Sequence, residues 1–370
     1  MSRNTMYKNL SAKCVAVLSL LLLTLLAKAQ EPLKVAFVYI SPVANAGWVF
    51  QHDLGRRAIE ETFNKANKTP LVKTTFVENV SEGPDAERVI RDLAKSGHQL
   101  IFTPSFGYME PTMQVAKEFP QVRFESVTGY KRALNVSTSN ARYYEGRYLA
   151  GVAAAKMSKT HLAGYVAAFP IPEVLQGINA FTLGMRSVDP QAKLKVVWVN
   201  SWFSPSLERD AAETLVNQGA DVLAYHTGTN AVMQVAQEKS VWAIAYHSDL
   251  SAKGFGSQLL AVTHHWEKYD VSRVRSMLEG SWKSKDTWGG LREGMVDIQG
   301  WNDKVPTSVK REVEEIKKQM IQGKTTVFKG PLLTQDAKLV AKEGAVLTDE
   351  QVQQMNYLLE GVLSPLPKSN

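Results

Sequence analysis

The sequence predicts an α/β protein with two similar lobes, each built on a parallel sheet. Apolar, β-branched runs alternate with helical patterns along most of the chain. A strand–turn–helix unit also occurs twice, and both copies contain Met-Gln-Val-Ala-x-Glu, at residues 113–118 and 233–238. No long linker separates the copies, so we expect short crossings between the lobes. Since parallel sheets bind ligands beyond the carboxyl ends of their strands, the two copies predict a central ligand cleft.

The first 29 residues have the pattern of a secretory signal peptide. Basic residues precede an apolar run from Val15 to Leu26, and Ala27-Lys28-Ala29 matches an A-x-A cleavage site. An uncleaved membrane anchor is the alternative, but the run is shorter than the roughly 20 residues that a span needs. We therefore expect cleavage after Ala29.

Cysteine content and charge exclude several classes of protein. Cys14 is the only cysteine of the chain and lies inside the predicted signal, so we expect a mature chain without disulfides. Lys13 before it does not fit a lipid-attachment site. Loss of four basic residues with the signal lowers the formal net charge from +7 to +3. This charge is too small to indicate binding to nucleic acid or membranes.

The first lobe is predicted to span residues 30–140, with a return segment near 264–285. Its first strand is the apolar run 33–40 after Pro32, and the helix at 50–65 carries apolar residues at helical spacing. Further strands are expected at 72–77, within 97–107, at 122–127 and at 135–140. Further helices are expected at 85–96 and 113–118, and near 271–278 in the return segment.

The second lobe is predicted to span residues 141–263, with residues 286–370 returning to it. Its first helix, near 143–157, is rich in alanine and glycine, which permits close packing. Strands are expected at 161–168, 194–199, 219–226, 241–247, 259–263 and 294–298. Further helices are expected at 174–189, 208–218, 233–238, 309–321 and 348–363.

The sequence contains no recognisable catalytic motif. A Gly-x-Ser-x-Gly elbow, a P-loop, Gly-x-Gly-x-x-Gly and His-Glu-x-x-His are all absent from it. The histidines at 226, 247, 264 and 265 lack a spacing that specifies zinc. We therefore expect a protein that is not an enzyme and that needs neither a metal nor another cofactor.

Aromatic and polar residues gather where predicted strands end. The aromatic residues are Trp48, Phe106, Tyr108, Trp202, Phe203, Tyr225 and Trp266. The polar residues are Asn45, Ser105, Glu125, Asn200, His226, Thr227, His247 and Asp249. A single loop tryptophan is more often a packing residue, and Asp249 also fits a helix N-cap. Several aromatic faces together favour a planar heterocycle, because each stacked pair contributes about 0.5–1.5 kcal/mol beyond area burial.

Four motifs resemble those of the basic membrane protein family, the purine nucleoside receptor-like substrate-binding proteins of ABC importers. They are Gly47-Trp48-x-Phe50-Gln51, Tyr144-Glu145-Gly146-x-Tyr148-Leu149-Ala150-Gly151, Gly219-Ala220-Asp221-Val222 and Ser248-Asp249. The resemblance covers residues 34–298 and implies a type I periplasmic-binding-protein fold with two Rossmann-like lobes. It also implies a monomeric periplasmic receptor that delivers its ligand to an ABC permease in the inner membrane.

The resemblance also implies roles for particular residues. Trp48 matches the aromatic residue that stacks on the base, and Glu125 matches the acid that contacts the base edge. Asn45 replaces a frequent aspartate, and His247 replaces the aspartate that holds ribose. Loss of that carboxylate would leave ribose hydroxyls unsatisfied, and His247 and Trp266 would fill the ribose space.

These departures resemble the branch that binds free purine bases such as adenine. A nucleoside receptor of the same fold and a secreted purine-processing enzyme or sensor are the alternatives. The expected ligand-binding residues are Asn45, Trp48, Phe106, Glu125, Trp202, His226, His247, Asp249 and Trp266.

Overall fold

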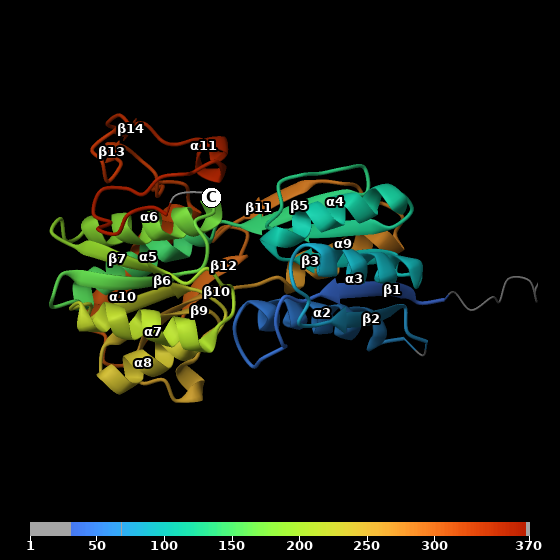
Figure 1. The fold of residues 1–370 in the computed structure, drawn as a ribbon, viewed down its shortest axis with the longest axis horizontal. Helices are drawn as coiled ribbons and strands as arrows, with labels where there is room; N and C mark the ends of the chain where they lie inside the picture. Colours follow the sequence, from blue (N-terminus) through green and yellow to red (C-terminus); the bar gives the residue numbers. More distant parts are fainter. Residues whose placement is uncertain (1–30, 68, 368–370) are drawn as a thin grey trace, which may run out of the picture.

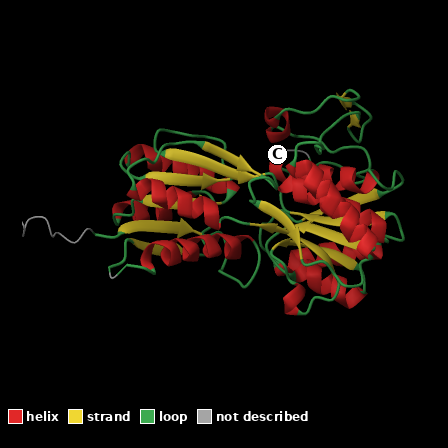
Figure 2. Cartoon of the chain, turned by 180° about the vertical axis from the view of Figure 1, so that it is seen from behind, coloured by secondary structure: helices red, strands yellow, loops and turns green. Residues whose placement is uncertain are grey.

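The computed structural model describes residues 31–67 and 69–367, and within them the chain forms two lobes that lie side by side (Figure 1). Each lobe has a six-stranded sheet with helices on its faces (Figure 2). The predicted signal peptide and Cys14 lie outside the described residues. In the described part of the chain, no helix has the length and apolarity to span a membrane.

The sheet of the first lobe is parallel throughout, with the order β11-β5-β4-β3-β1-β2. Its strands are β1 (Leu33–Val38), β2 (Val72–Val77), β3 (Leu100–Pro104), β4 (Arg123–Val127), β5 (Val136–Ala141) and β11 (Asp286–Gly289). Its helices are α2 (Trp48–Asn64), α3 (Pro84–Lys95), the short η1 (Phe106–Tyr108), α4 (Met109–Glu118) and α9 (Glu267–Leu278). The interior strands β1 and β3 are almost fully buried, as their apolar runs predict.

The second sheet repeats this order as β12-β10-β9-β8-β6-β7, and only its edge strand β12 runs antiparallel among the described strands. Its strands are β6 (Leu162–Ala167), β7 (Lys193–Trp198), β8 (Val222–His226), β9 (Trp242–His247), β10 (Gln258–His264) and β12 (Val296–Gln299). Its helices are α5 (Tyr143–Met157), α6 (Pro172–Arg186), α7 (Pro205–Asn217), α8 (Ala231–Lys239) and α10 (Thr307–Ile321). The small residues of α5 allow close packing on α6, because a Cβ at Gly151 would lie 2.1 Å from the Phe181 carbonyl oxygen.

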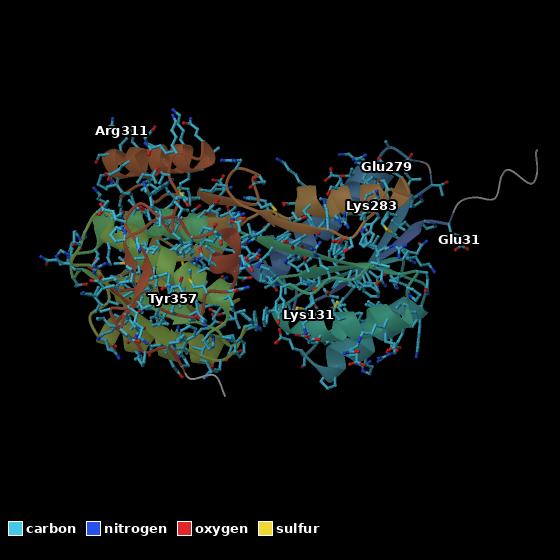
Figure 3. All side chains as sticks on the ribbon, turned by 90° about the horizontal axis from the view of Figure 1, so that it is seen from above. Glu31, Lys131, Glu279, Lys283, Arg311 and Tyr357 are labelled. Carbon is cyan, nitrogen blue, oxygen red and sulfur yellow. The ribbon has the colours of Figure 1, made fainter. Side chains whose placement is uncertain are left out.

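The chain crosses between the lobes after β5, after β10 and after β11. β11 pairs with β5, so residues 286–289, which we assigned to the second lobe, belong to the first sheet. The carboxylate of Glu145 on α5 accepts the Leu291 N–H at 2.7 Å, just beyond that strand. Figure 3 shows Glu279 and Lys283 of the return segment on the first lobe, and Arg311 on the second.

The predicted terminal helix at 348–363 is wrong over most of its length. Only α11 (Asp349–Gln353) is helical, and the short strands β13 (Leu332–Leu333) and β14 (Leu339–Ala341) precede it. The buried Asn179 side chain donates to the Tyr357 carbonyl and accepts the Leu359 N–H, both at 2.8 Å. Since α6 satisfies these backbone groups, the apolar tail can cover the second lobe without forming a helix.

Asp270 is a fully buried acid where α9 packs on α2. A Cβ at Gly55 of α2 would lie 2.0 Å from its Oδ2, so the glycine permits this contact. Within the described chain neither carboxyl oxygen has a hydrogen-bond partner. Burial raises the pKa of Asp270 well above its ordinary value of 3.8, and the negative charges of Glu125 and Glu267 raise it further.

Asp270 should therefore make the stability of the protein depend on pH. Above pH 3.8 the unfolded chain releases the Asp270 proton, whereas the folded state keeps it. The contribution of this carboxyl group to the stability of the fold is therefore fully present below pH 3.8 and decreases as the pH rises. We expect Asp270→Asn to raise the melting temperature at pH 7 and to lose this gain near pH 3.5. Thermal unfolding at both pH values measures the difference, with the exposed Asp336→Asn as control. An equal change in melting temperature at both pH values would contradict a protonated Asp270 carboxyl group in the folded protein.

Candidate functional site

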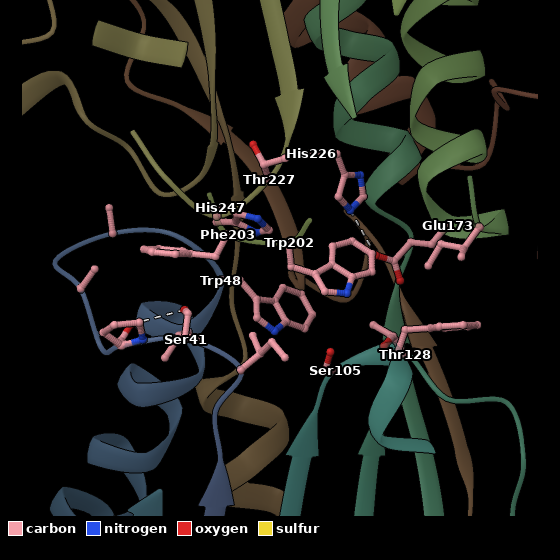
Figure 4. Close-up of a pocket in the computed structure, with 18 residues that line it drawn as sticks. Ser41, Trp48, Ser105, Thr128, Glu173, Trp202, Phe203, His226, Thr227 and His247 are labelled. Atoms are coloured by element: carbon pink, nitrogen blue, oxygen red, sulfur yellow. Dashed lines mark hydrogen bonds and ion pairs between the residues drawn. The ribbon is translucent and has the colours of Figure 1, made fainter. Parts of the chain in front are cut away.

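A cavity lies between the lobes, at the facing carboxyl ends of the two sheets (Figure 4). Its space not filled by atoms is about 620 Å³ with the open mouth included. It is lined by Ile40, Ser41, Pro42, Ala44, Ala46, Trp48, Val49, Ser105, Phe106, Thr128, Ile171, Glu173, Trp202, Phe203, His226, Thr227, Gly228 and His247.

The topology explains why the cavity forms there. In both lobes the second strand in sequence lies on one side of the first and the third strand lies on the other, so the strand order reverses beside β1 and β6. Crevices form at such switch points. The lining residues follow β1, β3, β6 and β8, the strands that flank the two switch points, together with β4, β7 and β9. The predicted turns at residues 105–107 and 225–227 therefore do face one cavity.

Trp48 is held rigidly at the start of α2. Its indole Nε1 donates to the Pro104 carbonyl at 2.8 Å, which connects the turns after β1 and β3. The His52 ring contacts it edge-on with a centroid distance of 4.4 Å, and the buried Trp266 packs behind both. Because the indole N–H is already bound, Trp48 offers a ligand its apolar faces.

The second lobe contributes its own aromatic side chains. Trp202, in the loop after β7, packs on Phe169 with a centroid distance of 5.0 Å. Its carbonyl accepts the Gly228 N–H at 2.8 Å, which fixes this loop to the turn after β8. Figure 4 shows the rings of Trp48 and Trp202 near the middle of the site, with Phe203 beside them.

Glu173 is the only aspartate, glutamate, lysine or arginine among the described residues that line the cavity. It lies in the first turn of α6, where the helix N-terminus favours a negative charge. Its Oε2 accepts from Asn140 Nδ2 of the first lobe at 3.0 Å, and its Oε1 lies 3.3 Å from His226 Nε2. The carboxylate thus has neighbours in both lobes.

Sequence reasoning missed Glu173. The signal was the turn Phe169-Pro170-Ile171-Pro172, which follows a strand of the second lobe in the position that the Trp48 loop occupies in the first. We predicted that turn but assigned no ligand-binding residue to it.

Burial favours the neutral forms of the two lining histidines. Burial lowers the pKa of His226, although Glu173 partly opposes this, and it lowers the pKa of His247 well below its ordinary value. His247 Nδ1 lies 3.0 Å from His264 Nδ1, and burial lowers the pKa of His264 in the same way. Neutral imidazoles can donate from one nitrogen and accept at the other, which suits hydrogen bonding to a neutral ligand.

The backbone is strained at two lining residues. Thr128 has φ 65° and His247 has φ 68°, in the left-handed region that costs non-glycine residues of order 1–3 kcal/mol. Thr128 directly follows β4, and His247 is the last residue of β9. Such conformations persist only where the surrounding structure holds the residue in place.

The cavity's electrostatics exclude some ligand classes. Among its lining residues, all within the described chain, there is no lysine or arginine. A phosphate or carboxylate ligand would thus meet the Glu173 carboxylate without a compensating cation, whereas a neutral ligand with N–H groups would not. In the described part of the chain, no group of three or more metal-ligating side chains could hold a metal ion.

Glu125, which we expected to contact the ligand, lies elsewhere. It is fully buried, and its carboxylate accepts from Arg273 Nε at 2.6 Å, Tyr269 OH at 2.7 Å and Trp282 Nε1 at 2.7 Å. Burial raises the pKa of Glu125, while Arg273 and the other two donors lower it. The prediction is wrong because its side chain joins β4 to the return segment that contains α9, away from the cavity.

Three other predicted residues also lie outside the cavity lining. Asp249 accepts from Gln258 Nε2 and the Ser251 N–H at 2.7 and 2.8 Å, so it stabilises its own turn. Asn45 is exposed, and its carbonyl accepts from Lys253 of the second lobe. Trp266 is fully buried behind Trp48 and does not fill the ligand space. The structure does bring Trp48, Phe106, Trp202, His226 and His247 to the cavity.

Comparison with known protein families shows which family the chain belongs to. The Bmp family, described as ABC transporter substrate-binding protein PnrA-like, matches residues 33–329. The chain belongs to the Bmp family. This agrees with the resemblance carried by the sequence motifs.

Individual relatives differ in the ligands that their names state. A purine-binding protein of Brucella abortus is 45% identical over 342 residues, covering 92% of this chain and 96% of that protein. A putative ABC transporter glucose-binding protein of Haloferax volcanii is 35% identical, covering 91% of this chain and 82% of that protein.

Solved structures agree on the fold. An ABC transporter solute-binding protein of Aeropyrum pernix superposes with a TM-score of 0.67 at 18% identity, covering 80% of this chain and 93% of that chain. A solute-binding protein of Conexibacter woesei gives 0.64 at 18% identity, covering 80% of this chain and 98% of that chain. The chain therefore has the type I periplasmic-binding-protein fold. As a Bmp protein it is a substrate-binding component of an ABC importer, a class that binds small ligands and a transporter.

The position of Glu125 predicts a structural role for it. Glu125→Gln leaves the buried Arg273 guanidinium without its carboxylate, and breaking such a pair costs about 3–5 kcal/mol. We expect a marked fall in the free energy of unfolding with unchanged relative affinities for different ligands. Urea unfolding and ligand titration measure the two effects, with the exposed Glu343→Gln as control. A stable variant with altered ligand preference would show instead that Glu125 contacts the ligand.

Proposed function

We propose that this Bmp protein is a periplasmic receptor that binds a free purine base, such as adenine, and delivers it to an ABC importer. The observation that carries the proposal is the composition of the cavity. It combines two tryptophans with one carboxylate and, among its described lining residues, no lysine or arginine. In this proposal the receptor acts as a monomer, without catalysis or a cofactor.

Stacking on the tryptophans supplies the main affinity. A purine is flat and apolar on both faces, so burial against Trp48 displaces water from both surfaces. Trp48 is already fixed by Pro104 and His52, so little side-chain entropy is lost when the ligand binds.

Glu173 supplies the polar recognition at the edge of the base. A carboxylate only accepts hydrogen bonds, and each of its oxygens can take more than one. Ring and exocyclic N–H groups of a purine are suitable donors. His226, whose Nε2 lies 3.3 Å from Glu173 Oε1, also lines the cavity beside this carboxylate.

A free base suits the cavity better than a nucleoside. His247 stands at the strand end where the family resemblance implies a ribose-binding aspartate. Asp249 is already engaged by Gln258 and Ser251, so it offers no free carboxylate to ribose. The name of the Brucella relative supports a purine, but it does not distinguish base from nucleoside.

A sugar is the second candidate, because the Haloferax relative is named as a glucose-binding protein. Sugars also stack on aromatic rings, but their hydroxyl groups need many polar partners when buried. The aromatic and apolar lining favours the purine.

Calorimetric titration of the mature protein tests the proposal. The ligands are adenine, guanine, hypoxanthine, adenosine, inosine, adenosine monophosphate and glucose. We expect at least one free base to bind more tightly than either nucleoside, with no binding of glucose or the nucleotide. Tighter nucleoside binding would contradict the ribose argument, and glucose binding alone would favour the sugar receptor. Turnover of a purine during the titration would indicate an enzyme.

Trp48 should make the largest aromatic contribution. Trp48→Ala removes a buried stacking surface, and we expect at least a tenfold loss of affinity for the preferred base. The same titration measures it, with Trp301→Ala, outside the cavity lining, as the control. Unchanged affinity in a folded variant would exclude Trp48 from the ligand site.

Glu173→Gln tests the edge recognition. A glutamine keeps one acceptor oxygen but replaces the other with a donor. Bases that carry different hydrogen-bond donors and acceptors at their edges should therefore lose different amounts of affinity. We expect about a tenfold loss for the preferred base and a changed ratio between adenine and hypoxanthine, because hydrogen bonds to charged groups contribute about 1.5–3 kcal/mol. A uniform effect on all ligands would show that Glu173 acts only on closure of the lobes.

A further inference from the structure

We infer that Ser248, Gly47 and Gln51 form a latch between the lobes that controls how long the ligand stays bound. The inference rests on the proposed binding of a purine in the cleft. None of the three residues lines the cavity within the described chain, so they would be positioning residues that act through their neighbours.

The latch consists of two hydrogen bonds to one hydroxyl group. Ser248 follows β9 in the second lobe, whereas Gly47 and Gln51 lie at the start of α2 in the first. Ser248 Oγ accepts from the Gly47 N–H at 3.2 Å and from Gln51 Nε2 at 2.8 Å. The Ser248 and Gln51 residues are only 5% and 6% exposed, so water has little access to these bonds.

Glycine is required where the lobes meet. Gly47 has φ 89°, in the region that favours glycine. A Cβ at this position would lie 2.7 Å from the carbonyl oxygen of Gly228 in the second lobe. The two backbones can therefore come together only without a side chain at residue 47, and this approach brings the Gly47 N–H to Ser248.

The latch is directly coupled to the ligand site. Gly47 precedes Trp48, and Ser248 follows His247, so each side of the latch adjoins a residue that lines the cavity. The rings of Trp48 and His247 lie 5.6 Å apart between centroids, across the boundary of the lobes. His247 has φ 68°, in the left-handed region, at the point where the chain passes from the cavity lining to the latch.

These bonds should stabilise only the closed protein. When the lobes separate, water can hydrogen-bond all three groups. When they close, the Gly47 N–H and the Gln51 amide depend on Ser248, and an unpartnered buried donor is costly. Loss of the hydroxyl should therefore speed reopening and ligand release without weakening the open protein.

The test compares Ser248→Ala and Gln51→Met with the exposed control Ser251→Ala. Adenine is the probe, and stopped-flow displacement gives its dissociation rate. We expect both variants to release adenine at least tenfold faster, with association changed less than threefold. The melting temperature of the ligand-free variants should equal that of the wild type, which distinguishes a latch from a general structural role. Unchanged dissociation, or equal destabilisation of the ligand-free protein, would overturn the inference.

Amide hydrogen exchange separates the latch from the purine proposal. If the wild type binds no purine, the proposed ligand is wrong, and exchange at the Gly47 amide still tests the latch in protein purified with the ligand that it retains. We expect protection of this amide in the wild type and its loss in Ser248→Ala. Equal exchange in the two proteins would overturn the latch whatever the ligand.

Discussion

The site depends on a carboxylate that is shared between the two lobes. The Glu173 carboxylate accepts a hydrogen bond from Asn140 of the first lobe and lies beside His226 of the second. No arginine or lysine is among the described residues that line the cavity. A carboxylate that a ligand covers needs hydrogen-bond donors, because an unsatisfied buried acceptor is costly. A neutral ligand that carries N–H groups can supply them, and it also fills the space beside the tryptophans. Charge and shape thus select the same class of ligand.

The surrounding fold keeps the cavity walls in place. The Glu82 carboxylate accepts from Ser105 Oγ at 2.5 Å and from the Gly107 N–H at 2.9 Å, which fixes the turn after β3. Pairing of Glu125 with Arg273 fastens the return segment to the first sheet, so that α9 and β11 stay with that lobe. These contacts lie within one lobe, whereas the contacts of Ser248 join the two. Closure can therefore change without disturbing the fold of either lobe.

The sequence predicted the fold well because alternating apolar strands and amphipathic helices are local signals. The turns that it selected in the two lobes do face one cavity, and five of the nine expected residues line it. The four others do not. Local patterns place Glu125 in a strand and Asp249 just beyond one, but they do not show which partners these side chains meet. Arg273, for example, is 148 residues from Glu125. The helix predicted at 348–363 was largely wrong because the backbone there accepts hydrogen bonds from side chains of α6. The periodicity of the sequence does not reveal such contacts.

The most direct measurement is the identity of any small molecule that the protein retains through purification. The mature protein would be purified without added ligand, denatured, and the released small molecules identified by mass spectrometry. We expect a free purine base in an amount that rises with the amount of protein and falls in Trp48→Ala. Release of a sugar or a nucleoside from the wild type, in place of a base, would contradict the proposed function.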